Sequence, residues 1–317
     1  MLRPPMNRSG KFHALLATAR IANIPSVVSN VWLGIMVGML RSESGLAGDG
    51  NHGIALMTLL PLAGVLLYVS GNFFNDWMDR VWDQQHRPER ALPRGLFSPA
   101  LYGGLALGFG LLGVFLAAAT SMPSGMVAAG IAGCVIVYTV FHKRTAWAVI
   151  PMGLCRALLP VMGSLAIYPY INDIWPVACG LFCYIMGLSL SARSESMAEP
   201  PKRVAILARA LLLGTLVVVA WGNKGLLIHT LPSVIGALPY LVWTHLCLKI
   251  WRKPVPLLVS RLLAGIPLVD WMVLLPVSWM MALHGPGGTI GYIVMGFCVP
   301  PLAFIAALLL QRVAPAT

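Results

Sequence analysis

The run FFNDWMDRVWDQQHRPERALPRG, residues 73–95, concentrates charge in an otherwise apolar chain. It holds four of the ten acids of the sequence and four of its arginines. Spacings of i, i+4, i+7 and i+11 place an amide and three carboxylates on one face of a helix that continues through the run: Asn72, Asp76, Asp79 and Asp83. Three carboxylates on one face repel one another, and a hard cation such as Mg²⁺, which prefers oxygen ligands, would relieve that repulsion.

The arginines of the same run suggest the partner of such a metal. Guanidinium groups bind phosphate oxygens in a two-pronged geometry, so an acid cluster beside an arginine cluster suits a metal-bound diphosphate. The alternative is a solvated loop in which acids and arginines simply pair, each pair contributing about 0–1 kcal/mol. The residue types alone leave both interpretations open.

The rest of the chain is that of an integral membrane protein. Of its 317 residues 58% are apolar and only 10% are charged, with a mean hydropathy of +0.80, whereas soluble domains carry about 25% charged residues. Ten apolar runs reach the roughly 20 residues that cross a bilayer as a helix. The sequence therefore predicts an all-α, polytopic bundle of nine to ten transmembrane helices, forming one domain over residues 1–317. The predicted spans are 15–40, 54–75, 99–119, 124–142, 147–169, 173–192, 203–222, 226–249, 261–283 and 288–311.

Basic residues are distributed unevenly between the two ends of these spans. They precede the first span and follow the second, fourth, sixth, eighth and tenth, while the other connections hold only Arg41 and Lys224. By the positive-inside rule, the N-terminus and the charged loops are predicted to be cytoplasmic, and the protein to be a multi-pass protein of the cell inner membrane. The net charge of +12 fits this bias and attraction to anionic membrane lipids, and it does not indicate a nucleic-acid partner.

The charged run also resembles the first motif of the UbiA superfamily of intramembrane prenyltransferases. That motif reads N-D-x-x-D-x-x-x-D, and Asn75 is its first residue here, followed by the three aspartates. Arg90, Pro93 and Gly95 resemble the R-P-x-P-x-G-like turn that follows it. The variant NDxxDRxxD, which contains Arg80, resembles the chlorophyll-synthase branch, and RPERALPRG resembles UbiA-like proteins encoded in ebo gene clusters.

Two further stretches carry the resemblance onward, so that it covers roughly residues 20–205. YTVFHKR, residues 138–144, is similar to the Y-x4-K-R pattern of the family, and MGLCRALLPVMG, residues 152–163, is similar to its next span. The resemblance implies transfer of a prenyl group from a prenyl diphosphate to a small-molecule or lipid acceptor within the membrane. It implies Mg²⁺ as the cofactor, with Asp76, Asp79 and Asp83 as ligands.

The resemblance also implies roles for the remaining site residues. Tyr138 would face the carbocation formed when the diphosphate leaves. Contacts to the diphosphate would come from amide and basic side chains: Asn72, Asn75, Arg80, Arg90, Lys143, Arg144, Arg156, Arg193 and Lys202.

One departure from the family lies after the sixth span, where a second aspartate motif is expected. The chain reads SARSESMAEPPKR there, so Glu195 and Glu199 would have to supply the second set of metal ligands, at an i, i+4 spacing. This change leaves an alternative function open. The chain would then be a degenerate UbiA homologue acting as a lipid or isoprenoid carrier, a transporter or a membrane scaffold.

Overall fold

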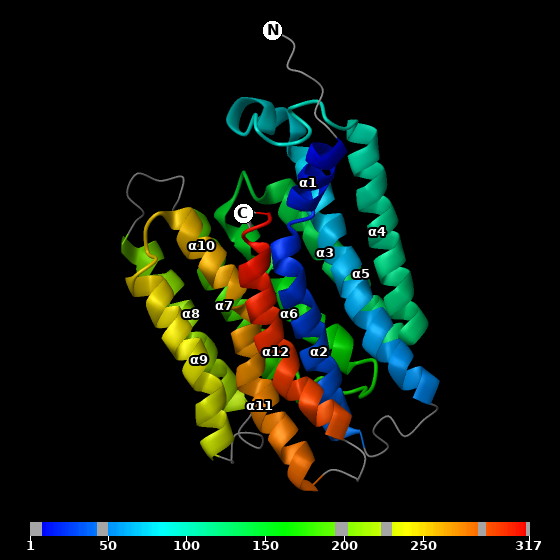
Figure 1. Ribbon diagram of the computed structural model, residues 1–317, viewed down its shortest axis with the longest axis vertical. Helices are drawn as coiled ribbons and strands as arrows, with labels where there is room; N and C mark the ends of the chain where they lie inside the picture. Colours follow the sequence, from blue (N-terminus) through cyan, green and yellow to red (C-terminus); the bar gives the residue numbers. More distant parts are fainter. Residues whose placement is uncertain (1–7, 43–49, 194–201, 223–229, 285–289, 315–317) are drawn as a thin grey trace.

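The computed structural model describes residues 8–42, 50–193, 202–222, 230–284 and 290–314, and this part of the chain consists of helices joined by turns and loops, without a strand (Figure 1). The helices follow one another in the order α1 (Arg8–Thr18), η1 (Ile21–Asn23), α2 (Ile24–Arg41), α3 (Gly50–His86), α4 (Pro99–Thr120), α5 (Met122–Phe141), η2 (Ala146–Ala148), α6 (Val149–Ser164), α7 (Trp175–Arg193), α8 (Lys202–Gly222), α9 (Thr230–Lys249), α10 (Val255–Ala264), α11 (Ile266–His284) and α12 (Ile290–Leu310). The predicted all-α membrane fold is confirmed.

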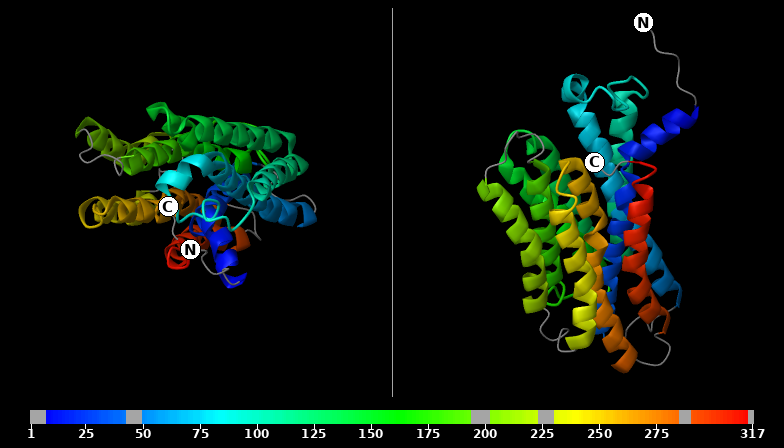
Figure 2. Two further views of the ribbon diagram at one scale, coloured as in Figure 1. Left: turned by 90° about the horizontal axis from the view of Figure 1, so that it is seen from above. Right: turned by 60° about the vertical axis from the view of Figure 1, so that its left-hand side comes forward.

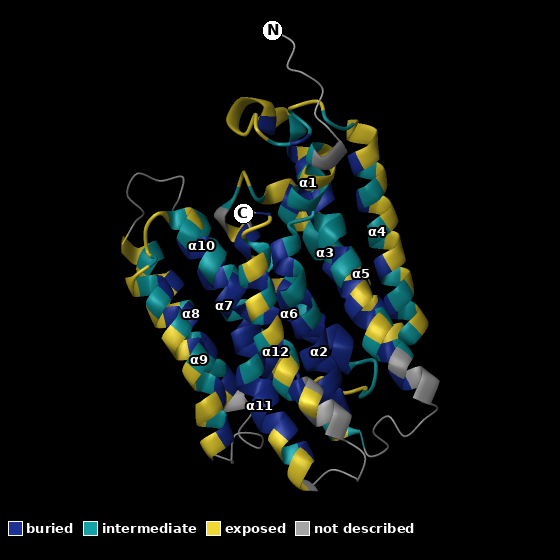
Figure 3. Cartoon of the chain, in the orientation of Figure 1, coloured by how far each residue is buried: buried dark blue, intermediate teal, exposed yellow. Residues whose placement is uncertain are grey.

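Helix α2 forms the centre of the bundle. It packs against α3, α6, α11 and α12, and 78% of its apolar span is buried. The outer helices instead present apolar side chains outward (Figure 3). On α4, for example, Leu107, Leu111 and Phe115 are each more than 60% exposed, as a surface that meets lipid hydrocarbon requires.

Each predicted span coincides with a helix, but the boundaries differ in informative ways. Eight described helices are long and apolar enough to cross a membrane, while Val149–Ser164 and Gly296–Leu310 are shorter apolar helices. The first span begins at Ile21 and not at residue 15, because Arg20 adopts a left-handed conformation (φ 49°) that separates α1 from α2. The span predicted at 261–283 is divided at Gly265 into α10 and α11. The span predicted at 226–249 contains α9, which is described from Thr230 to Lys249.

Helix α3 continues well beyond the predicted span of 54–75. Its 37 residues run without a break to His86, with Pro61 inside the helix. In Figures 1 and 2 its C-terminal part projects at the end of the bundle where α1 and the connection to α4 also lie. This extension carries the residues of the charged run.

The contact between α2 and α6 depends on glycine. A Cβ atom at Gly34 would overlap the carbonyl group of Pro160, and one at Gly163 would overlap the carbonyl oxygen of Val31. Glycines that let two backbones approach closely are a common means of helix association in membranes, where apolar burial alone cannot drive it. The two glycines therefore fix the distance between the central helix and α6.

We predict that Gly34→Ala lowers the stability of the folded protein by about 1–3 kcal/mol, because the new methyl group forces α2 and α6 apart. Gly108→Ala is the matched control, since a Cβ there meets no atom within 4 Å. Thermal unfolding in detergent, followed by tryptophan fluorescence, should show a lower Tm for the first variant only. Equal Tm values for the two variants would contradict the close contact.

Candidate active site

Three aspartates lie on one face of the extended C-terminal part of α3. Asp76 and Asp79 are each 8% exposed, and Asp83 is only 1% exposed. The expected helix therefore continues through the motif and aligns the carboxylates. Because burying a carboxylate costs several kcal/mol unless a cation or hydrogen-bond donor compensates it, the cluster depends on neighbouring cations.

Arg90 compensates two of the three carboxylates. After α3 the chain folds back through a turn that ends at Gly95, whose positive φ of 67° favours glycine. This turn brings the Nη1 atom of Arg90 to 3.1 Å from Asp76 Oδ1 and 2.9 Å from Asp83 Oδ2. Arg90 and Gly95, which resemble the second part of the UbiA motif, thus act together. Gly95 closes the turn, and the turn places the cation of Arg90 beside the carboxylates.

The environment of Arg90 keeps it charged. Burial alone would lower the pKa of this guanidinium, but the carboxylates of Asp76 and Asp83 outweigh burial and raise its pKa above the usual value. A guanidinium already titrates far above neutral pH. The cation is therefore a permanent part of the site.

Asp79 is compensated from a different direction, by the residues that follow α5. Its Oδ1 atom lies 2.7 Å from Lys143 Nζ, and its Oδ2 atom lies 3.3 Å from His142 Nε2. The Lys143 ammonium also lies 3.8 Å from the ring centroid of Trp82, and the His142 ring stacks on Tyr138 at 5.0 Å. Lys143 thus contacts the carboxylates directly, and Tyr138 lies next to them through His142, where α3 meets the end of α5. Their roles toward the diphosphate and the carbocation stay predictions.

Sequence reasoning missed two members of this cluster, His142 and Trp82. A signal for the histidine was available, because it follows Tyr138 by four residues and directly precedes Lys143. Residues four apart share a helix face. The sequence holds no comparable signal for Trp82. This tryptophan meets Lys143 only because α3 packs against the end of α5.

The amide and arginine residues of α3 divide between the cluster and other contacts. Asn75 donates to Asp79 Oδ2 over 3.4 Å and so belongs to the cluster. Asn72 is buried and donates to a backbone carbonyl just after α1. Arg80 donates to a carbonyl of its own helix and lies over the Trp77 ring. Asn72 and Arg80 therefore flank the carboxylates without contacting them.

The basic residues at the ends of α5, α7 and α8 are also unequally placed. The Nη1 atom of Arg193 donates to the carbonyl of Thr145 over 3.0 Å and lies 3.4 Å from that of His142, joining the end of α7 to the segment that carries Lys143. Arg144 and Lys202 are exposed. Glu195 and Glu199 lie outside the described residues, so the prediction that they bind a metal stays a prediction.

Arg156 belongs to a second polar cluster, inside the bundle. It is 7% exposed, its Nη1 atom donates to Asn30 Oδ1 over 3.2 Å, and its guanidinium lies 5.3 Å from the ring centroid of Tyr68. Asn30 and Ser29 in turn donate to the buried carboxylate of Asp270. These contacts connect α2, α6 and α11, and the assignment of Arg156 to the diphosphate stays a prediction.

Residues 31–284 match the UbiA prenyltransferase family. The chain belongs to this family. The match continues well past residue 205, into helices that the sequence alone identified only as hydrophobic. Membership in the chlorophyll-synthase-like or ebo-cluster branch of UbiA proteins stays a prediction.

Two solved UbiA structures with TM-scores above 0.5 share the fold of this chain. A digeranylgeranylglyceryl phosphate synthase is 15% identical, with a TM-score of 0.53 over 94% of this chain and 99% of that one. A UbiA homologue from Aeropyrum pernix K1 is 13% identical, with a TM-score of 0.53 over 90% and 98% of the two chains. A UbiA homologue from Archaeoglobus fulgidus bound to GPP and Mg²⁺ is 14% identical, with a TM-score of 0.48 over 94% and 99%.

The oxygen atoms of this UbiA chain fit a magnesium ion that arrives with a phosphate ligand. Asn75 Oδ1 and Asp83 Oδ1 are buried and accept no hydrogen bond within the described residues, so both have a free coordination position. In the same part of the chain, no three of the acid, histidine and cysteine side chains converge closely enough to enclose an ion. Mg²⁺ commonly takes one or two carboxylates and completes its shell with water and substrate phosphate oxygens, which is the arrangement that this donor set allows.

We predict that Arg90→Gln destabilises the protein by about 2 kcal/mol, because it leaves two buried carboxylates without their shared cation. The triple variant Asp76→Asn, Asp83→Asn, Arg90→Gln should recover most of this loss, since the uncompensated charges are gone. Thermal unfolding in EDTA measures the loss of stability in Arg90→Gln and its recovery in the triple variant. Arg87→Gln, at an exposed position, is the control. A triple variant no more stable than Arg90→Gln would show that the arginine acts through packing and not through charge.

Proposed function

We propose that this UbiA chain transfers a prenyl group from a prenyl diphosphate to an acceptor within the membrane, with Mg²⁺ as cofactor. One observation carries the proposal: three buried carboxylates on α3 are interleaved with Arg90 and Lys143, which come from two other segments. Arg90 and Lys143 bring two positive charges to three carboxylates, so the cluster keeps an excess of negative charge that a metal cation can balance. A site with both free carboxylate oxygens and fixed cations can hold a metal and a diphosphate together.

Donor binding rearranges contacts that already exist in the cluster. One or two of the carboxylates of Asp76, Asp79 and Asp83 would bind Mg²⁺ together with phosphate oxygens of the donor, and the bound metal would supply positive charge against the diphosphate. Arg90 and Lys143 now bind carboxylates, and in the complex they would turn toward the phosphates. About a quarter of each of these two side chains is exposed, so both can contact a ligand that binds at the aspartates of α3.

Transfer then proceeds by loss of the diphosphate. The bond between the allylic carbon and the bridging oxygen breaks, and its electron pair leaves with the diphosphate. Arg90 and Lys143 stabilise the negative charge that grows on this leaving group, and fixed cations do so without reorganisation. An electron-rich atom of the acceptor forms a bond to the allylic cation and releases its proton. Tyr138, beside His142 at the end of α5, would present its ring to the cation, and the surrounding helices exclude water.

A second function is favoured by the altered acid motif after α7. If SARSESMAEPPKR cannot complete the site, the chain would bind a prenyl diphosphate without transferring it, as a carrier or scaffold. Product formation from a radiolabelled prenyl diphosphate, in membranes supplied with aromatic and lipid acceptors, separates the two. Donor binding without turnover, with every acceptor, would select the carrier.

The proposed orientation places this site on the cytoplasmic side of the inner membrane. A cysteine replacing the exposed Gln85 should react with a membrane-impermeant maleimide only after cells are opened. Tyr170→Cys, in the exposed connection between α6 and α7, is the control and should react in intact cells. The reverse pattern would overturn the orientation.

We predict that Asp76→Asn or Asp79→Asn weakens binding of a non-hydrolysable prenyl thiodiphosphate by at least about tenfold and abolishes its Mg²⁺ dependence, since each removes an anionic ligand. Calorimetry with Mg²⁺ and with EDTA measures both effects. Asp173→Asn is the matched control, because Asp173 pairs with Arg41 away from the site. If the Asp79 variant binds the analogue with wild-type affinity and the wild-type response to Mg²⁺, the cluster is only a structural set of ion pairs.

A further inference from the structure

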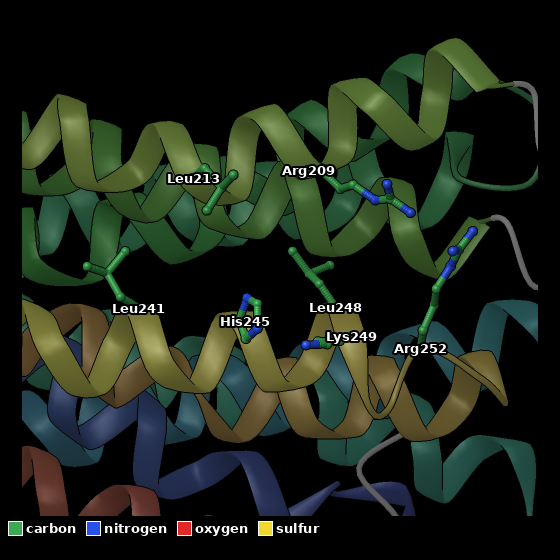
Figure 4. Close-up of a pocket in the computed structure, with 7 residues that line it drawn as sticks. All are labelled: Arg209, Leu213, Leu241, His245, Leu248, Lys249 and Arg252. Carbon is green, nitrogen blue, oxygen red and sulfur yellow. The ribbon is translucent and has the colours of Figure 1, made fainter.

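Helices α8 and α9 follow one another in the chain but pack on different neighbours. α8 packs on α7, whereas α9 packs on α11 and α10. In the view from above they lie at one edge of the bundle, in two separate rows (Figure 2). A cleft of about 610 Å³ lies between them, lined by Arg209, Leu213, Leu241, His245, Leu248, Lys249 and Arg252 (Figure 4).

The lining of this α8–α9 cleft is amphipathic along its length. Figure 4 shows the guanidinium groups of Arg209 and Arg252 toward one end, with Leu213 and Leu241 toward the other. The cationic end lies where α9 finishes at Lys249, which is the end of the bundle that also holds the charged part of α3 (Figure 1). From Leu241 to Lys249 the helix rises roughly 12 Å, which spans a lipid headgroup and the start of its hydrocarbon chain.

Within the described part of the chain, no acid forms an ion pair with the cations of the cleft. Among the residues that the structure describes, the ion pairs of the aspartates are all made elsewhere: with Arg90, Lys143, His142 and Arg41. Lys249 and Arg252 alone could be membrane-surface anchors. Arg209 is different, because it lies two turns inside α8, lines the cleft and extends its exposed side chain toward the end that holds Arg252 (Figure 4).

We propose that the α8–α9 cleft binds an anionic glycerophospholipid. The phosphate would lie against Arg209, Lys249 and Arg252, and one acyl chain would follow Leu213 and Leu241. Basic pockets between transmembrane helices recognise anionic headgroups in this way. A zwitterionic lipid would bring its own ammonium group toward three cations, so the cleft selects against it. The bound lipid supplies the packing that α8 and α9 do not give each other.

The cleft is a site apart from the proposed active site. It lies on α8 and α9, whereas the carboxylates lie on α3 and their cations follow α3 and α5. Without a carboxylate among its lining residues, the cleft binds its anion without a metal. Lipid binding should therefore persist in EDTA, which distinguishes it from binding of a prenyl diphosphate to the aspartates.

Native mass spectrometry of the purified protein with phosphatidylglycerol or phosphatidylcholine tests the proposal. We expect the wild-type protein to prefer phosphatidylglycerol by about tenfold or more, in EDTA as well as in Mg²⁺. The variant Arg209→Gln, Lys249→Gln, Arg252→Gln should lose this preference. The control Arg203→Gln, Lys253→Gln, Arg312→Gln removes the same charge from exposed positions outside the cleft and should keep it.

A second arm tests the apolar half of the cleft. Leu213→Trp with Leu241→Trp fills the path of the acyl chain and keeps every cation, so phosphatidylglycerol binding should weaken while binding of free glycerol phosphate is unchanged. Equal retention of both lipids by the wild-type protein would overturn the proposal, as would an unchanged preference in the Arg209 triple variant. Displacement of the lipid by a prenyl thiodiphosphate at equal concentration would assign the cleft to the donor instead.

Discussion

Compensation of three buried carboxylates by cations from other segments is the interaction on which the proposed active site depends. Asp76, Asp79 and Asp83 are aligned by α3 alone, and in that arrangement they repel one another. The cluster is stable because Arg90 and Lys143 reach it from two directions. This requirement explains why α3 extends to His86, why the chain turns back at Gly95 and why α5 ends beside α3.

The bundle beneath the site has its own constraint, which is the close fit of α2 in its centre. Glycine permits the backbone contact with α6, and a polar cluster joins α2 to both α6 and α11 through Asn30, Arg156 and Asp270. Inside a membrane such side chains must bind one another, because no water is available to them. The cluster therefore orients the helices that hold α3 in place, whether or not Arg156 also meets a ligand.

The sequence was informative where function depends on spacing along one helix. The alignment of the three aspartates and the all-α membrane fold could be predicted from it, whereas Lys143 was assigned to the site only through the resemblance to the UbiA family. The pairing of Arg90 with two carboxylates could not, because it depends on a turn whose path is set by tertiary contacts. Helix breaks at Arg20 and Gly265 were also missed, since hydropathy reports how apolar a run is and not where its backbone bends.

Two basic regions lie at the same end of the molecule, but only the region around α3 has carboxylates paired with its cations. This difference determines what each region can bind. Around α3, Arg90 and Lys143 already have carboxylate partners, so a phosphate that binds them must displace those carboxylates, and a metal would hold the carboxylates that are released. In the α8–α9 cleft the cations have no described acid to release, so a phosphate can bind them directly and needs no metal. A doubly anionic diphosphate with Mg²⁺ suits the first region, and a singly charged headgroup with its chain in lipid suits the second. The ratio of acid to base at each place, more than the total charge of +12, therefore separates the proposed metal-dependent active site from the proposed metal-independent lipid site.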